Sequence, residues 1–146
     1  MLQNGKQLGI IASVIACLVA AGCLSRSSSE AAKYPVSGSV QWKGEPLEVG
    51  TIFFVPKTAT GNGTTLDIAG GEFVSSGVAQ QLIPGEYRIE ITSAKKTGKV
   101  IPGPGPNGQV EEIIQVISTR YNANSTLTAQ VSDTAENRYQ FKLTNN

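Results

Sequence analysis

The chain has 146 residues, of which 40% are apolar and 16% charged, and its formal net charge is +1. A charge this small provides no general attraction to nucleic acid. The sequence contains no histidine, which excludes the usual general base near neutral pH, the Ser-His-Asp and Cys-His nucleophile systems, and histidine-ligated zinc.

The first residues have the order of a secretory signal peptide. Lys6 precedes an apolar run from Leu8 to Gly22, which ends in small residues directly before Cys23. The run is about 15 residues long, whereas a membrane-spanning helix needs about 20. This order resembles the signal of bacterial lipoproteins, which implies that a lipid is attached to the sulfur of Cys23 and that the chain is cleaved before it.

We therefore expect a signal peptide over residues 1–22 and a lipidated flexible tether over residues 23–34, a segment that is small, polar and aperiodic. Ala20 departs mildly from the lipoprotein pattern, which prefers Leu, Val or Ile there, and Cys17 is the alternative lipidation site. After cleavage Cys23 is the only cysteine, so no intrachain disulfide can form. The expected location is the cell envelope, at the outer membrane or periplasmic face rather than in the cytoplasm, with the membrane as partner through the lipid.

The pattern becomes typical of short β-strands from Pro35 onward. Residues 36–42 alternate between apolar and polar, and residues 49–55 form a second apolar run after a turn at Gly44-Glu45-Pro46. A loop follows over residues 57–64. Gly70-Gly71 separates two further apolar runs and predicts a two-residue hairpin, because the favoured hairpin turns need positive φ.

The clearest alternation of the chain lies in its second half, at Tyr87, Ile89 and Ile91, which we expect to be buried. Lys95–Gln109 is proline-rich and is predicted to be a long loop. Residues 110–118 could form a strand or a short helix, and their β-branched content favours a strand. The final strands are expected at residues 127–131 and 139–143. About seven strands and no convincing helix predict an all-β fold, a single antiparallel Greek-key β-sandwich over residues 35–146.

Two local patterns carry a family resemblance. The first is Gly38-Ser39-Val40, Gly44-Glu45-Pro46-Leu47 and Thr51-Ile52-Phe53-Phe54, and the second is Leu82-Ile83-Pro84-Gly85-Glu86-Tyr87-Arg88-Ile89. Together they resemble the transthyretin-like, carboxypeptidase-regulatory-like β-sandwich modules. The stretch from Ile117 to Thr128 is similar to the ending of small bacterial lipoproteins of this fold, although many of these have proline where this chain has Ser118. The resemblance implies the fold and says almost nothing about function.

Several residues are candidates for a functional site. Gly103-Pro104-Gly105-Pro106-Asn107-Gly108 matches G-x-G-x-x-G, but two of its residues are prolines without an N–H donor, so a solvated loop is the better interpretation than a phosphate site. Four carboxylates, Asp67, Glu72, Glu86 and Glu90, could act in acid/base chemistry or bind calcium, and surface charge is the simpler interpretation. Of the aromatic residues Trp42, Phe53, Phe54, Tyr87, Tyr121 and Tyr139, only Trp42 lies near a strand end, where it could stack on a sugar.

These observations predict a non-catalytic envelope lipoprotein with a structural or binding role. No catalytic, cofactor-binding or metal-ligating residue is assigned, no cofactor is expected, and Cys23 is the single predicted site, for lipidation. The alternative is a carbohydrate- or protein-binding module that acts through aromatic residues at the loop ends. A hydrolase using carboxylates is less favoured, because the 5-hydroxyisourate hydrolases of the transthyretin-like fold rely on histidines. No nucleic-acid partner is expected, and the sequence does not decide whether the partner is a protein or a polysaccharide.

Overall fold

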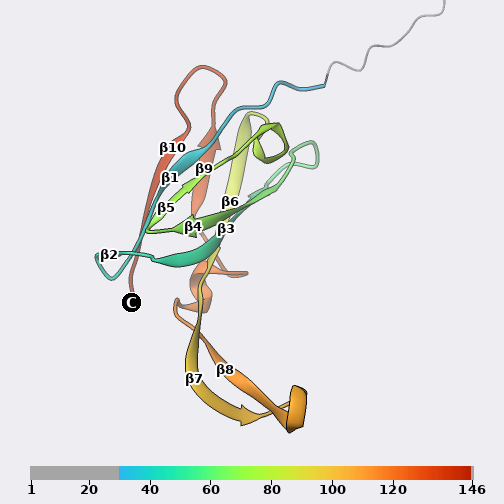
Figure 1. Ribbon diagram of the computed structural model, residues 1–146. Coiled ribbons are helices and arrows are strands. Elements are labelled where there is room, and N and C mark those ends of the chain that lie inside the picture. The colour runs from blue at the N-terminus through green and yellow to red at the C-terminus, as the bar shows by residue number, and fades with distance from the viewer. Residues whose placement is uncertain (1–29, 146) are drawn as a thin grey trace, which may run out of the picture.

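The computed structural model describes residues 30–145, and over this range the chain forms β-strands and three short 3-10 helices (Figure 1). The 3-10 helices are η1 (Val78–Gln80), η2 (Pro106–Gly108) and η3 (Thr119–Tyr121). The predicted all-β class is therefore confirmed. The expected signal peptide, residues 1–22, and the expected lipidation site, Cys23, lie outside the described residues.

Seven strands form one continuous sheet in the order β10-β1-β5-β4-β3-β6-β9. Its strands are β1 (Ser37–Trp42), β3 (Val49–Pro56), β4 (Thr64–Ala69), β5 (Glu72–Val74), β6 (Gly85–Thr92), β9 (Thr128–Val131) and β10 (Arg138–Leu143). An eighth strand, β2 (Glu45–Pro46), pairs with the end of β1. The pairs within this sheet are antiparallel, as expected, except that β1 and β10 run parallel.

The sheet curls so that its inner face encloses the core, in a β-sandwich-like arrangement (Figure 1). Side chains connect its two edge strands, β9 and β10. The Tyr139 hydroxyl donates to the Gln130 carbonyl oxygen over 2.8 Å. The buried Asn137 side chain accepts from the Ser132 N–H at 2.7 Å and donates to the Ser132 carbonyl at 3.0 Å. These bonds hold the curl closed where backbone pairing ends.

The core follows the predicted alternation. Tyr87, Ile89 and Ile91 of β6 are 1%, 0% and 0% exposed, which confirms the register expected for this strand. Phe54 of β3 lies at the centre, with its ring centroid 6.0–6.3 Å from those of Phe73, Tyr87 and Tyr139. Because these rings belong to β5, β6 and β10, they connect strands that are distant within the sheet. Aromatic pairs in this geometry contribute beyond the area they bury.

Gly38 allows the parallel pairing of β1 with β10. A Cβ atom at this position would lie 2.0 Å from the carbonyl oxygen of Tyr139 and 2.7 Å from Cζ of Phe73. Only glycine therefore lets β1 approach β10 while the Phe73 ring packs beneath it.

The β4–β5 hairpin has the predicted Gly70-Gly71 turn. Ala69 pairs with Glu72 across it, and the two glycines have φ values of 59° and 81°. The chain reaches the sheet through Tyr34, which forms an antiparallel bridge with Leu82.

Two strands leave the sheet and form a separate arm, β7 (Ala94–Pro102) and β8 (Gln109–Gln115), which projects from the lower end of the body in Figure 1. The strand predicted over residues 110–118 is thus confirmed for β8. The loop predicted over Lys95–Gln109 is wrong for β7. Neither face of β7 is covered by the body, so its sequence has no apolar alternation, and its structure comes from pairing with β8.

Candidate functional site

A hollow lined by both apolar and charged side chains lies at the lower end of the body, where β1 and β2 face the root of the arm. We call it the Trp42 groove, and its volume is about 490 Å³. Binding sites for small molecules usually have volumes of roughly 300–1,000 Å³. Its lining residues are Trp42, Glu45, Pro46, Leu47, Glu48, Val49, Ser93, Ala94, Lys95, Lys96 and Val116.

A tight turn between β1 and β2 shapes one wall of this groove. Lys43 and Gly44, the two residues between the strands, both have positive φ, 56° and 90°. Two-residue hairpin turns of this kind match the twist of the flanking strands. The Lys43 ammonium lies 5.3 Å from the centre of the Trp42 ring, so a cation–π contact helps to fix the indole. Trp42 is half-buried, packs against the core and contributes its accessible part to the groove.

The opposite wall is the root of the arm. The Ser93 hydroxyl donates to the Val49 carbonyl over 2.7 Å, and the Val116 N–H donates to the Ser93 carbonyl over 2.8 Å. These bonds hold the two ends of the arm next to each other and against β3. Lys95 and Lys96, which follow Ser93 and Ala94 in the chain, are exposed at the rim of the groove.

The arm itself exposes large apolar side chains. Val100, Ile113 and Ile114 are 57%, 61% and 47% accessible. Charged residues surround them, with Lys96 paired to Glu111 at 2.9 Å and Lys99 near Glu112 at 4.0 Å. The pKa of Lys96 is raised by its hydrogen bond to Glu111 and by the attraction between the two charges. The G-x-G-x-x-G match forms the tip of this arm, which agrees with the predicted solvated segment rather than a phosphate site.

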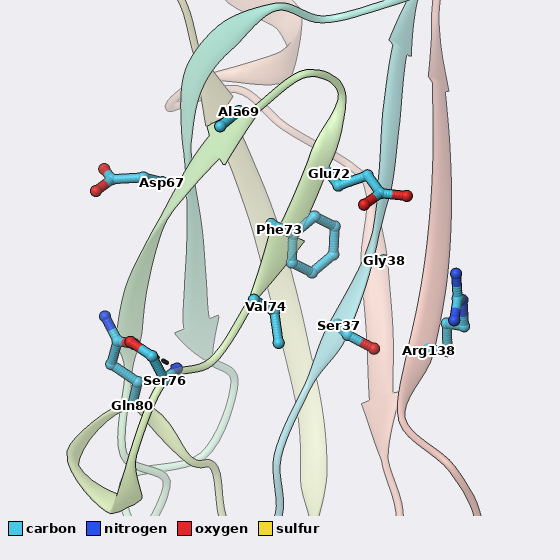
Figure 2. Close-up of a pocket in the computed structure, with 10 residues that line it drawn as sticks. All are labelled: Ser37, Gly38, Asp67, Ala69, Glu72, Phe73, Val74, Ser76, Gln80 and Arg138. Atoms are coloured by element: carbon cyan, nitrogen blue, oxygen red, sulfur yellow. Dashed lines mark hydrogen bonds between the residues drawn. The ribbon is translucent and has the colours of Figure 1, made fainter.

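A second hollow of about 450 Å³ lies on the outer face of the sheet, over β1, β4 and β5 (Figure 2). Two of the candidate carboxylates, Asp67 and Glu72, line it, but Figure 2 shows their side chains pointing away from each other. At its lower end Gln80 accepts hydrogen bonds from the backbone N–H and the hydroxyl of Ser76, at 2.7 and 2.9 Å. The hollow thus lacks converging acids.

The other two candidate carboxylates are paired with cations. Glu86 lies 2.7 Å from Lys57, and Glu90 lies 2.5 Å from Arg88 on the outer face of β6. Within residues 30–145, no group of three or more His, Cys, Asp or Glu side chains could hold a metal ion. The four candidate carboxylates therefore lie apart and form no common site.

The aromatic candidates separate as predicted. Phe54, Tyr87 and Tyr121 are buried, Phe53 and Tyr139 are partly buried, and Trp42 alone of the six lines the groove. Sequence reasoning identified Trp42 but missed its polar neighbours Glu48 and Lys95. Only the path of the chain brings these residues to one place, and no sequence motif links them.

None of the described residues belongs to a helix with the length and apolar character needed to cross a membrane.

Comparison with known proteins assigns the chain to no family. No protein-family model matches the chain, and neither does any curated protein or solved structure.

Proposed function

We propose that this protein is a non-catalytic lipoprotein of the cell envelope, a transthyretin-like Greek-key β-sandwich that is anchored through Cys23 and binds another protein through its arm. The observation that carries this proposal is the placement of the arm. In Figure 1 the described chain enters at the upper end of the body, and β7 and β8 project from the opposite end.

This placement directs the arm away from the proposed anchor. A tether of 11 residues, 24–34, spans at most about 40 Å. The nine residues of β7 extend the arm by about 30 Å. A lipid at Cys23 would hold the upper end of the body near the membrane. The arm would then point away from the membrane, toward molecules on the far side of the body.

The chemistry of the arm favours a protein partner. Exposed apolar patches rimmed by polar residues mark interaction sites in proteins, and Val100 and Ile113 lie on one face of the arm with the paired Lys96 and Glu111. An isolated two-stranded hairpin is only marginally stable in water, so a partner that covers these side chains would stabilise the arm. The arm has no aromatic residue on which a polysaccharide could stack.

Two variants test the two parts of the proposal. Cys23→Ser should leave the protein unprocessed or release it from membranes, which cell fractionation measures. Normal acylation of this variant would instead support Cys17, and normal cleavage without any acylation would support no lipidation at all. Ile113→Lys should abolish a discrete adduct formed by chemical cross-linking in intact envelopes.

Val78→Lys is the matched control for the cross-linking, because Val78 is 67% exposed on the body while Ile113 is 61% exposed on the arm. The control should keep the adduct. If Ile113→Lys kept it too, the arm would not be the binding element.

A further inference from the structure

We propose that the Trp42 groove binds a neutral oligosaccharide. This site lies on the body and at the root of the arm, so it is distinct from the apolar residues Val100, Ile113 and Ile114 that we assign to a protein partner. The inference depends neither on the lipid anchor nor on that partner.

The lining of the groove has an apolar part and a charged part, and a sugar likewise has an apolar face and a polar edge. Its apolar part is made by Trp42, Pro46, Leu47 and Val116, which come from β1, β2 and the segments after β2 and β8. A pyranose ring has a face of C–H groups that packs on aromatic and aliphatic side chains, and its hydroxyls project from the ring edge, where they donate and accept hydrogen bonds. The indole is the largest apolar side chain in the groove, and its mobility is already limited by Lys43.

The charges of the groove favour a ligand without net charge. Glu45 and Glu48 stand on the β2 side, and Lys95 and Lys96 stand on the arm side. Two glutamates and two lysines give the lining no net charge, so neither an anion nor a cation gains a net attraction. Hydroxyl groups, in contrast, can donate to carboxylates and accept from ammonium groups.

Three of these charges are available to a ligand. Within residues 30–145, Glu45, Glu48 and Lys95 take part in no ion pair, while Lys96 is already bonded to Glu111. Hydrogen bonds to charged groups are stronger than those between neutral groups, so Glu48 and Lys95 on opposite walls are the residues most suited to orient a sugar.

The charged rim of the groove disfavours a fatty acyl chain. Such a chain has no polar edge, and it would leave the carboxylates and ammonium groups at the rim without partners. A sugar satisfies the apolar floor and the charged rim together.

The fluorescence of Trp42 provides a direct test, because it is the only tryptophan of the chain. The full-length protein, purified in a detergent without a sugar headgroup, is titrated with the β-1,4-linked N-acetylglucosamine tetramer, cellotetraose and maltotetraose. We expect at least one of them to change the Trp42 emission saturably, with a Kd of about 1 mM or tighter. Glu48→Gln and Lys95→Gln should each weaken that binding about tenfold, since each removes a charge-assisted hydrogen bond.

Glu86→Gln is the control, because Glu86 is an exposed carboxylate bonded to Lys57 outside the groove. It should bind the sugar as the unchanged protein does, and circular dichroism should show the same fold in all variants. The proposal is overturned if none of the three sugars changes the emission, if laurate alone does so, or if Glu86→Gln weakens binding as much as Glu48→Gln. Ile113→Lys should leave sugar binding intact, which separates this result from the proposed arm function.

Discussion

Two tyrosines, one in the core and one packed against it, make the stability of this protein sensitive to alkaline pH. Burial raises the pKa of Tyr87, whose hydroxyl donates to the Ile83 carbonyl at 2.8 Å, and burial followed by the proximity of Tyr87 raises the pKa of Tyr139. An acid whose pKa is higher in the folded than in the unfolded state contributes its full stabilisation below its unfolded pKa, which is about 10 for tyrosine. This contribution is lost as the pH rises through the folded pKa, because the unfolded state then gives up its proton more readily than the folded state. We expect urea unfolding to show a fall in stability above about pH 10, and Tyr87→Phe to make this fall shallower. An unchanged slope in Tyr87→Phe would contradict the assignment.

The β4–β5 hairpin depends on its two glycines for different reasons. Both have positive φ, but a Cβ atom on Gly70 would meet nothing within 4 Å, while one on Gly71 would lie 2.6 Å from Cβ of Pro46. Gly70→Ala should therefore cost about 1 kcal/mol for the left-handed backbone alone. Gly71→Ala should cost about 1–3 kcal/mol more, because Pro46 and the turn around it must shift. Thermal and urea unfolding measure both, and equal costs would show that Pro46 yields easily.

Whether a single element could be predicted depended on whether the body buries one of its faces. β6 was predictable because Tyr87, Ile89 and Ile91 point into the core and alternate with polar residues. β7 was not, because it is exposed on both faces and its sequence, with three lysines and a glycine in nine residues, resembles a loop. The parallel pairing of β1 with β10 was also missed, because it joins distant segments and leaves its only local trace at Gly38.

At the scale of the whole molecule, Trp42 is the only residue of the candidate groove that the sequence predicted. Trp42 was identified because it is aromatic and lies near the end of an alternating strand. Glu48 and Lys95 join it because the start of β3, directly after Glu48, pairs with the end of β6, shortly before Lys95. Such convergence depends on topology and not on sequence spacing.

The body should fold without the arm. No residue between Lys95 and Ile114 belongs to the hydrophobic core, and Ala94 pairs with Gln115 next to the 2.8 Å bond between Ser93 and Val116. Residues 95–114 can therefore be replaced by an Asn-Gly turn, which the hairpin geometry favours. We expect urea unfolding to remain cooperative, with a free energy of unfolding within about 1 kcal/mol of the full chain, as for changes that remove no core contact. A loss of several kcal/mol would instead show that the arm stabilises the sheet, in which case the arm would be a structural element first. If the body is unaffected, the arm is maintained for a role outside the fold, and the shortened protein should also lose the envelope cross-link that we assign to Ile113.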